Sequence, residues 1–238
     1  MTTNRKATYD RRLRNVARYL SSKPKYQKPA MQLIENLEHF NLSNRRLDFP
    51  PFELEILSTK ECIGRNGQGW VCVNGYLEID CDGRLTRQSV AVSILFLEDE
   101  SRPPEIIRRF HFDYERQIAE RSSHHWPHTH FQYGGKFNDR HYPDHWQGAD
   151  PCPFPKADLP RFLCHPSDFM VTLDTVFSLY GNAEDHKLQS DGTWGAALQS
   201  AEETFLKPYF DTLSGRMPVR GESYFTFLAE KSLIIQIL

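Results

Sequence analysis

Histidine is unevenly distributed along this chain. The 238 residues include ten histidines, and most of them fall within one stretch of about 35 positions. The clustered residues are His111, His124, His125, His128, His130, His141 and His145. An imidazole titrates near neutral pH and is a common ligand of transition metals. The cluster therefore predicts acid–base chemistry or metal binding wherever the backbone brings several rings together.

Two predicted strands, 105–114 and 128–133, decide which of these rings can meet. Side chains alternate between the two faces of a strand, so every second residue shares a face. If the two strands are neighbours, their polar faces coincide. The resulting patch comprises His111, Asp113, His128, His130 and Gln132. Gly134 and Gly135 follow at once, and they allow a sharp bend or the close approach of a ligand to the backbone.

The patch admits three interpretations. In the first, a zinc or manganese ion held by His111, His128 and His130 activates a water molecule for hydrolysis. The same chemistry without a metal would use two imidazoles as acid and base, with His111, Asp113 and His130 as catalytic residues. In the second, Gln132 and its neighbours recognise a ligand. In the third, these side chains form a buried polar core that hydrogen-bonds internally and adds rigidity rather than chemistry.

The motifs of several enzyme classes are absent from this sequence. The chain has no GxxxxGK[ST], GxGxxG or GxSxG, which argues against P-loop, dinucleotide-dependent and α/β-hydrolase enzymes, and it has no HExxH zinc motif. No apolar run approaches the 18 residues that a membrane span requires, and the first residues lack the apolar core of a secretory signal. The five cysteines form no CxxC pair, which indicates free thiols. We therefore expect a cytoplasmic protein.

The formal net charge of −2 hides a strong separation of charge. Residues 1–28 contain nine basic side chains and one acid, a net charge of +8, whereas the other 210 residues carry −10. A positive segment binds polyanions because it releases their condensed counterions. The predicted nucleic-acid-binding residues are Arg5, Lys6, Arg11, Arg12, Arg14 and Arg18. An acidic protein surface is the alternative partner.

The same segment carries an apolar stripe at helical spacing. Its members are Tyr9, Leu13, Val16, Ala17 and Leu20. A helix with this pattern packs on the acidic body of its own chain. Alternatively, the tyrosines Tyr9, Tyr19 and Tyr26 stack on the bases of a nucleic acid.

The remainder of the chain predicts an α+β fold. The predicted helices cover 29–42, 168–180 and 194–213, and the predicted strands cover 52–57, 70–80, 89–97, 105–114 and 128–133. Pro50-Pro51 separates the first helical part from the strands, and Ser167 is the expected N-cap of the second helix. Successive strands with short turns favour an antiparallel β-meander of four to five strands, flanked by N-terminal and C-terminal helices. We expect a basic helical arm, 1–28, on a single α+β domain, 29–238.

Three strings extend this argument: HFDY at 111–114, HTHFQYGG at 128–135 and LPRFLCHPSDFMVTLDTVFSLYGN at 159–182. Together they resemble a group of uncharacterised bacterial proteins that share an HxQxGG strand end and a later Pro-Arg segment. The resemblance implies a small cytoplasmic protein whose gene lies on genomic islands with phage-defence or toxin–antitoxin genes. It points to ligand-binding residues rather than to a catalytic assignment, and these are Gln132, Gly134, Gly135 and Arg161.

Three functions follow as hypotheses. The first is an accessory or recognition component of a bacterial defence or mobile-element system, which engages nucleic acid or an acidic protein through its basic arm. The second is a metal- or histidine-dependent hydrolase of the phosphodiesterase or nuclease kind. The third is a remote analogy to ubiquitin-conjugating (E2-like) folds, with Cys152 as the nucleophile, although the His-Pro-Asn tripeptide of that family is missing.

Overall fold

One antiparallel sheet organises the chain, and each strand pairs with the next along the sequence. The computed structural model describes residues 3–40, 44–81, 85–99, 102–115, 128–134, 142–149, 162–163 and 167–207. The strands are β1 (Arg46–Ile56), β2 (Gln68–Ile79), β3 (Leu85–Leu97), β4 (Glu105–Glu115), β5 (His128–Tyr133) and the short β6 (Phe162–Leu163). This arrangement confirms the predicted α+β fold with an antiparallel meander.

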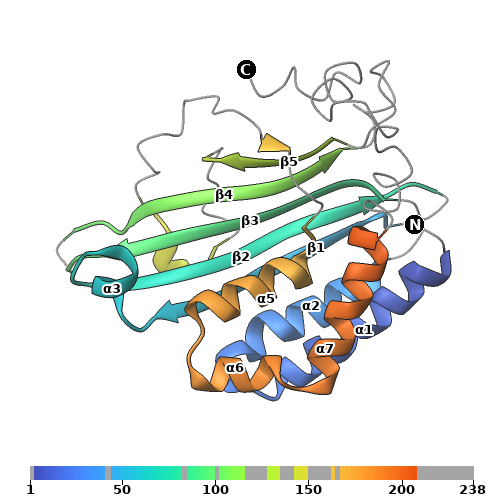
Figure 1. Cartoon of the computed structure of the whole chain (residues 1–238), viewed down its shortest axis with the longest axis horizontal. Coiled ribbons are helices and arrows are strands. Elements are labelled where there is room, and N and C mark those ends of the chain that lie inside the picture. The colour runs from blue at the N-terminus through green and yellow to red at the C-terminus, as the bar shows by residue number, and fades with distance from the viewer. Residues whose placement is uncertain are drawn as a thin grey trace, which may run out of the picture.

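The helices lie on one side of the sheet (Figure 1). They are α1 (Thr3–Ser21), α2 (Gln27–His39), α3 (Thr59–Ile63), α5 (Phe169–Tyr180), α6 (Ala183–Gln189) and α7 (Gly192–Ala201). Short turns of other helical types are η1 (Pro24–Tyr26), η3 (Asp144–Trp146) and the π-helical η4 (Glu202–Leu206). None of the helices within the described residues has both the length and the apolar character that crossing a membrane demands.

Strand β1 begins earlier than the sequence predicts and runs through Pro50-Pro51. The pairing with β2 is interrupted between Phe49 and Phe52, so the two prolines form a bulge. This position is compatible with proline because β1 is an edge strand, where the missing N–H groups remove no internal ladder bond.

The predicted N-cap of α5 is off by one residue. The Asp168 carboxylate, rather than Ser167, accepts a hydrogen bond from the Val171 N–H (2.9 Å). Ser167 instead contacts the Thr172 hydroxyl at 3.0 Å. Both residue types cap helices, so local sequence could not separate them.

Helix α1 is part of the hydrophobic core. Its five stripe residues are each at most 1% exposed, and they share one core cluster with the inner face of the sheet. Two tyrosines also hydrogen-bond the N-terminal segment to the C-terminal helical part. Tyr9 donates to Asp168 (2.6 Å), and Tyr26 donates to Asp185 (2.6 Å). Both rings are buried, so the idea that these two tyrosines stack on bases is wrong.

Candidate functional site

The sheet face opposite the helices carries a row of polar side chains. In the β4–β5 register, His111 lies opposite Gln132 and Asp113 lies opposite His130. Directly opposed residues of an antiparallel pair share a face. The predicted neighbourhood of the two strands is therefore confirmed, and the register brings the predicted patch residues to one face. His128 joins them opposite Glu115, although the side chains of His128 and His130 lie outside the described residues.

His111 and Asp113 form a direct contact on this face. The His111 Nε2 atom lies 2.9 Å from the Asp113 carboxylate, which identifies Nε2 as a donor. The imidazole is only 13% exposed, and its other nitrogen, Nδ1, is buried without a hydrogen-bond partner among the described residues. A general base must reach its substrate. Because the free nitrogen is the buried one, the geometry favours a structural or positioning use of His111 over proton transfer.

The other predicted site residues have mixed outcomes. Gly134 directly follows β5 with a left-handed φ of 85°, and its N–H donates to the Arg109 carbonyl (2.7 Å), so the predicted bend is present. Gly135, Arg161 and Cys152 lie outside the described residues. No three His, Cys, Asp or Glu side chains converge on a possible metal position in the described part of the chain. The zinc or manganese assignment stays a prediction, because two of its three proposed ligands have no described side chain.

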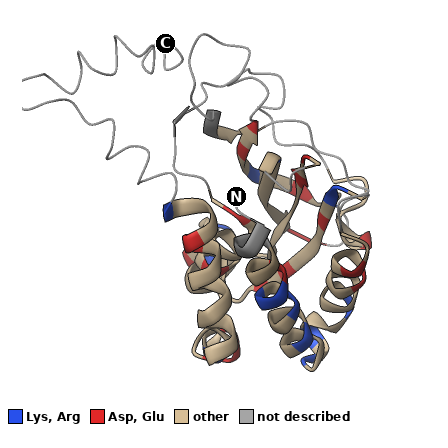
Figure 2. Cartoon of the chain, turned by 90° about the vertical axis from the view of Figure 1, so that its right-hand side faces the viewer, with Lys and Arg blue, Asp and Glu red and all other residues tan. Residues whose placement is uncertain are grey.

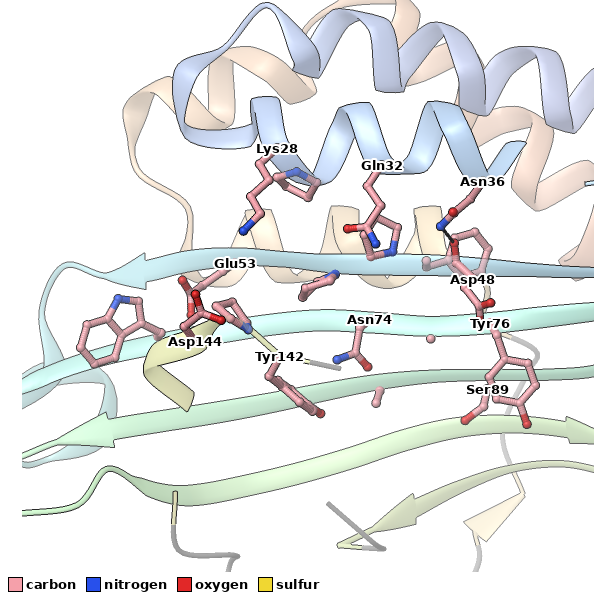
Figure 3. Close-up of a pocket in the computed structure, with 18 of the residues that line it drawn as sticks. Lys28, Gln32, Asn36, Asp48, Glu53, Asn74, Tyr76, Ser89, Tyr142 and Asp144 are labelled. Atoms are coloured by element: carbon pink, nitrogen blue, oxygen red, sulfur yellow. Dashed lines mark hydrogen bonds between the residues drawn. The ribbon is translucent and has the colours of Figure 1, made fainter. Parts of the chain in front are cut away.

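A groove opens beside this patch on the same face (Figure 3). It has a volume of about 1020 Å³ and runs from α2 across β1, β2 and β3 to β4. Two residues with small side chains, Ser89 and Ala91, contribute to its lining, and they leave space above the sheet. Its polar lining includes Asn74 and Arg109. Sequence analysis missed Arg109, although it lies two positions before His111 and therefore on the same face of the strand.

Segment 142–149 packs over part of this face. Glu53 of β1 accepts hydrogen bonds from His145 Nε2 (2.8 Å) and from the Trp146 indole. Burial raises the pKa of Glu53, although these two hydrogen bonds act in the opposite direction. The Tyr142 hydroxyl bonds Ser93 (2.7 Å), so the segment is attached at two points.

Three basic residues of α1 lie on the side opposite its apolar stripe. Positions 11, 14 and 18 are three and four residues apart, so Arg11, Arg14 and Arg18 form one row along the helix. Arg14 donates to the Leu37 carbonyl near the end of α2 (3.1 Å). Arg11 and Arg18 are exposed, and neither pairs with an acid among the described residues. Figure 2 shows Lys and Arg positions on the helices and also on the sheet.

Of the remaining basic residues of α1, the structure describes the side chain of Arg12 only. Arg12 is half-buried and also pairs with no described acid. Arg5 and Lys6 belong to α1, but their side chains lie outside the described residues.

Comparisons of the chain with protein-family models, with curated proteins and with solved structures gave no match.

Proposed function

We propose that this protein is a recognition component that binds nucleic acid through the arginine row of α1, formed by Arg11, Arg14 and Arg18. The single observation that carries this proposal is that the row stays on the surface of a helix whose opposite side is fully buried. The resemblance noted in the sequence adds the setting that we propose, a bacterial defence or mobile-element system.

Among the described residues, no acid pairs with Arg11 or Arg18. Within the described residues, the one ion pair between the N-terminal 28 residues and the remaining chain joins Lys25 to Asp185 (3.0 Å). The acidic body is instead held to α1 by apolar contacts and by the bond of Tyr9 to Asp168, and to η1 by the bond of Tyr26 to Asp185. The positive charge on Arg11 and Arg18 is therefore available to an external polyanion.

The geometry of the row suits phosphate. Seven residues separate Arg11 from Arg18, which corresponds to about 10 Å along a helix axis. Each guanidinium can donate two parallel hydrogen bonds to one phosphate. A helix fixed by its core loses little conformational freedom on binding, so these contacts retain most of their strength.

A matched pair of double variants tests the proposal. The test variant is Arg11→Gln/Arg18→Gln, and the control is Arg65→Gln/Arg102→Gln, which removes the same formal charge outside α1. In the control pair, Arg102 is exposed and pairs with Glu98, and Arg65 is half-buried and pairs with Glu105. Affinity for fluorescent single- and double-stranded oligonucleotides would be measured by anisotropy at constant salt. We expect a loss of about tenfold or more in the test variant, because each charge-assisted contact contributes roughly 1 kcal/mol or more. Equal affinity of the test and control variants would refute the proposal, and binding only to an acidic protein would replace nucleic acid with that partner.

A second candidate is a metal- or histidine-dependent hydrolase that acts on phosphodiesters. The β4–β5 register supports it, since Asp113 lies opposite His130 and beside His111. This candidate predicts that the purified protein retains zinc or manganese, and that His111→Ala and His130→Ala lower both metal content and phosphodiesterase activity. Wild-type protein without stoichiometric metal and without activity would eliminate it. The E2-like alternative depends on Cys152 and stays a prediction.

A further inference from the structure

Arg109 is a half-buried cation without an acidic partner among the described residues. Its Nη1 donates to the Gly134 carbonyl (3.1 Å), and its Nε lies 3.5 Å from the Tyr142 hydroxyl. Both partners are neutral, so they orient the guanidinium without compensating its charge. A partly buried charge is normally paired, because its desolvation is costly.

Among the described residues, the guanidinium of Arg109 has donors without an acceptor. An arginine side chain has five N–H groups in a fixed plane, and the two contacts of Arg109 use two of them. The Nη2 atom has no acceptor among the described residues. The plane is held by Tyr142 on one side and by the end of β5 on the other, so the free donors are already positioned for a ligand.

The groove surrounds this cation with further hydrogen-bonding groups. Asn74, Tyr76, Ser89 and Tyr142 line it together with Arg109, and the first four side chains lie on the same side of the sheet (Figure 3). All four carry a side-chain N–H or O–H. A volume of about 1020 Å³ accommodates a small organic molecule.

No described carboxylate, Asp144 included, pairs with Arg109. The acids that line the groove are Asp48, Glu53, Glu55 and Asp144. Three of them belong to β1, which lies three strands from β4 and therefore about 14 Å across the sheet. On β4 itself, Asp113 lies four residues from Arg109, about 13 Å along the strand, and it contacts His111.

We propose that this groove binds a small organic anion, and that a phosphate or carboxylate group of the ligand pairs with Arg109 at the β4 side. The neutral donors of β2, β3 and segment 142–149 hydrogen-bond the rest of the molecule. The site is separate from the arginine row of α1, so it does not depend on the proposed nucleic-acid function.

The test measures binding of defined probes to the full chain by isothermal titration. The phosphate arm uses inorganic phosphate and uridine monophosphate, the carboxylate arm uses succinate and citrate, and uridine is the uncharged control. We expect at least one anionic probe to bind and uridine to bind more weakly. Tighter binding of the phosphate probes or of the carboxylate probes identifies which of the two groups the site prefers. The proposal is overturned if every anion has a dissociation constant above about 10 mM, a binding free energy weaker than about 3 kcal/mol.

Three variants assign the binding to the groove. Arg109→Gln removes the cation, and Arg108→Gln is its matched control, because Arg108 is the exposed neighbour on β4 whose charge acts on Tyr180 of α5. We expect about a tenfold or greater loss of affinity in the first and little change in the second. Ser89→Leu narrows the groove without changing its charge, and it should also weaken anion binding. This second variant tests the proposal even if Arg109→Gln does not fold. Anion affinity that survives both Arg109→Gln and Ser89→Leu overturns the proposal.

Discussion

Replacing Tyr9 by phenylalanine tests whether α1 is fixed to the body, on which the proposed function depends. The substitution keeps the ring and its edge-on contact with Phe205, whose centroid lies 5.2 Å away. It removes only the hydrogen bond from the hydroxyl to the buried Asp168 carboxylate (2.6 Å). One carboxylate oxygen then loses this donor, while the other keeps the Val171 N–H.

The expected cost is about 2 kcal/mol, since hydrogen bonds to charged groups contribute roughly 1.5–3 kcal/mol. For a chain of this size, that corresponds to a decrease in Tm of about 4–8 °C. The matched control is Tyr19→Phe in the same helix, because the Tyr19 hydroxyl makes no hydrogen bond with the described residues; its cost should stay below about 0.5 kcal/mol. Urea unfolding would give both values from the transition midpoint at constant m.

The pH dependence of this effect has a definite sign. Burial raises the pKa of Asp168, and the bonds from Tyr9 and the α5 backbone hold it lower than burial alone would. Without the Tyr9 hydroxyl, the native pKa rises further above the unfolded value. The native state then binds more protons than the unfolded state, so stability falls as pH rises from the unfolded pKa through the native pKa. The destabilisation should therefore be largest at neutral pH and should shrink in acid. A cost equal to that of Tyr19→Phe, or one that grows in acid, would refute this reasoning.

Two further substitutions test the hydrogen bonds that Asp185 and Glu53 accept. Burial alone would raise the pKa of Asp185, but its hydrogen bonds, including the one from Tyr26, hold that pKa below its ordinary value. Asp185→Asn should cost about 1.5–3 kcal/mol at pH 7 by urea unfolding, and this difference should vanish as pH falls through the native pKa; a constant cost down to strong acid would contradict the assignment. Glu53→Gln weakens the acceptor of the Trp146 indole and should red-shift tryptophan emission, whereas Glu55→Gln on the same strand should not. Identical spectra for the two variants would show that this contact does not hold segment 142–149.

Local periodicity predicted strands β2 to β5 and the stripe of α1, but not the start of β1 at Arg46. The alternation around His111 and Asp113 predicted the shared face because a strand has a period of two, whatever packs above it. The spacing from Tyr9 to Leu20 predicted a buried helical stripe for the same kind of reason. In each case the decisive information lay within a dozen consecutive residues.

Features that depend on distant contacts could not be predicted in this way. Asp168 and Asp185 bind tyrosines that are each 159 positions away, and no local pattern signals such a pairing. Pro50-Pro51 is tolerated in β1 only because that strand lies at the edge of the sheet. Arg109 stands out only when the absence of a described acidic partner is seen in three dimensions.

The salt dependence of nucleic-acid affinity tests the central claim most directly. The logarithm of the association constant falls linearly with the logarithm of salt concentration, with a slope of about −0.9 per phosphate contact on duplex DNA. If Arg11 and Arg18 each contact a phosphate, the slope of Arg11→Gln/Arg18→Gln should be shallower than that of the wild type by about 2. The control Arg65→Gln/Arg102→Gln should keep the wild-type slope. A test variant with the wild-type slope would contradict the assignment of the α1 row as the nucleic-acid contact.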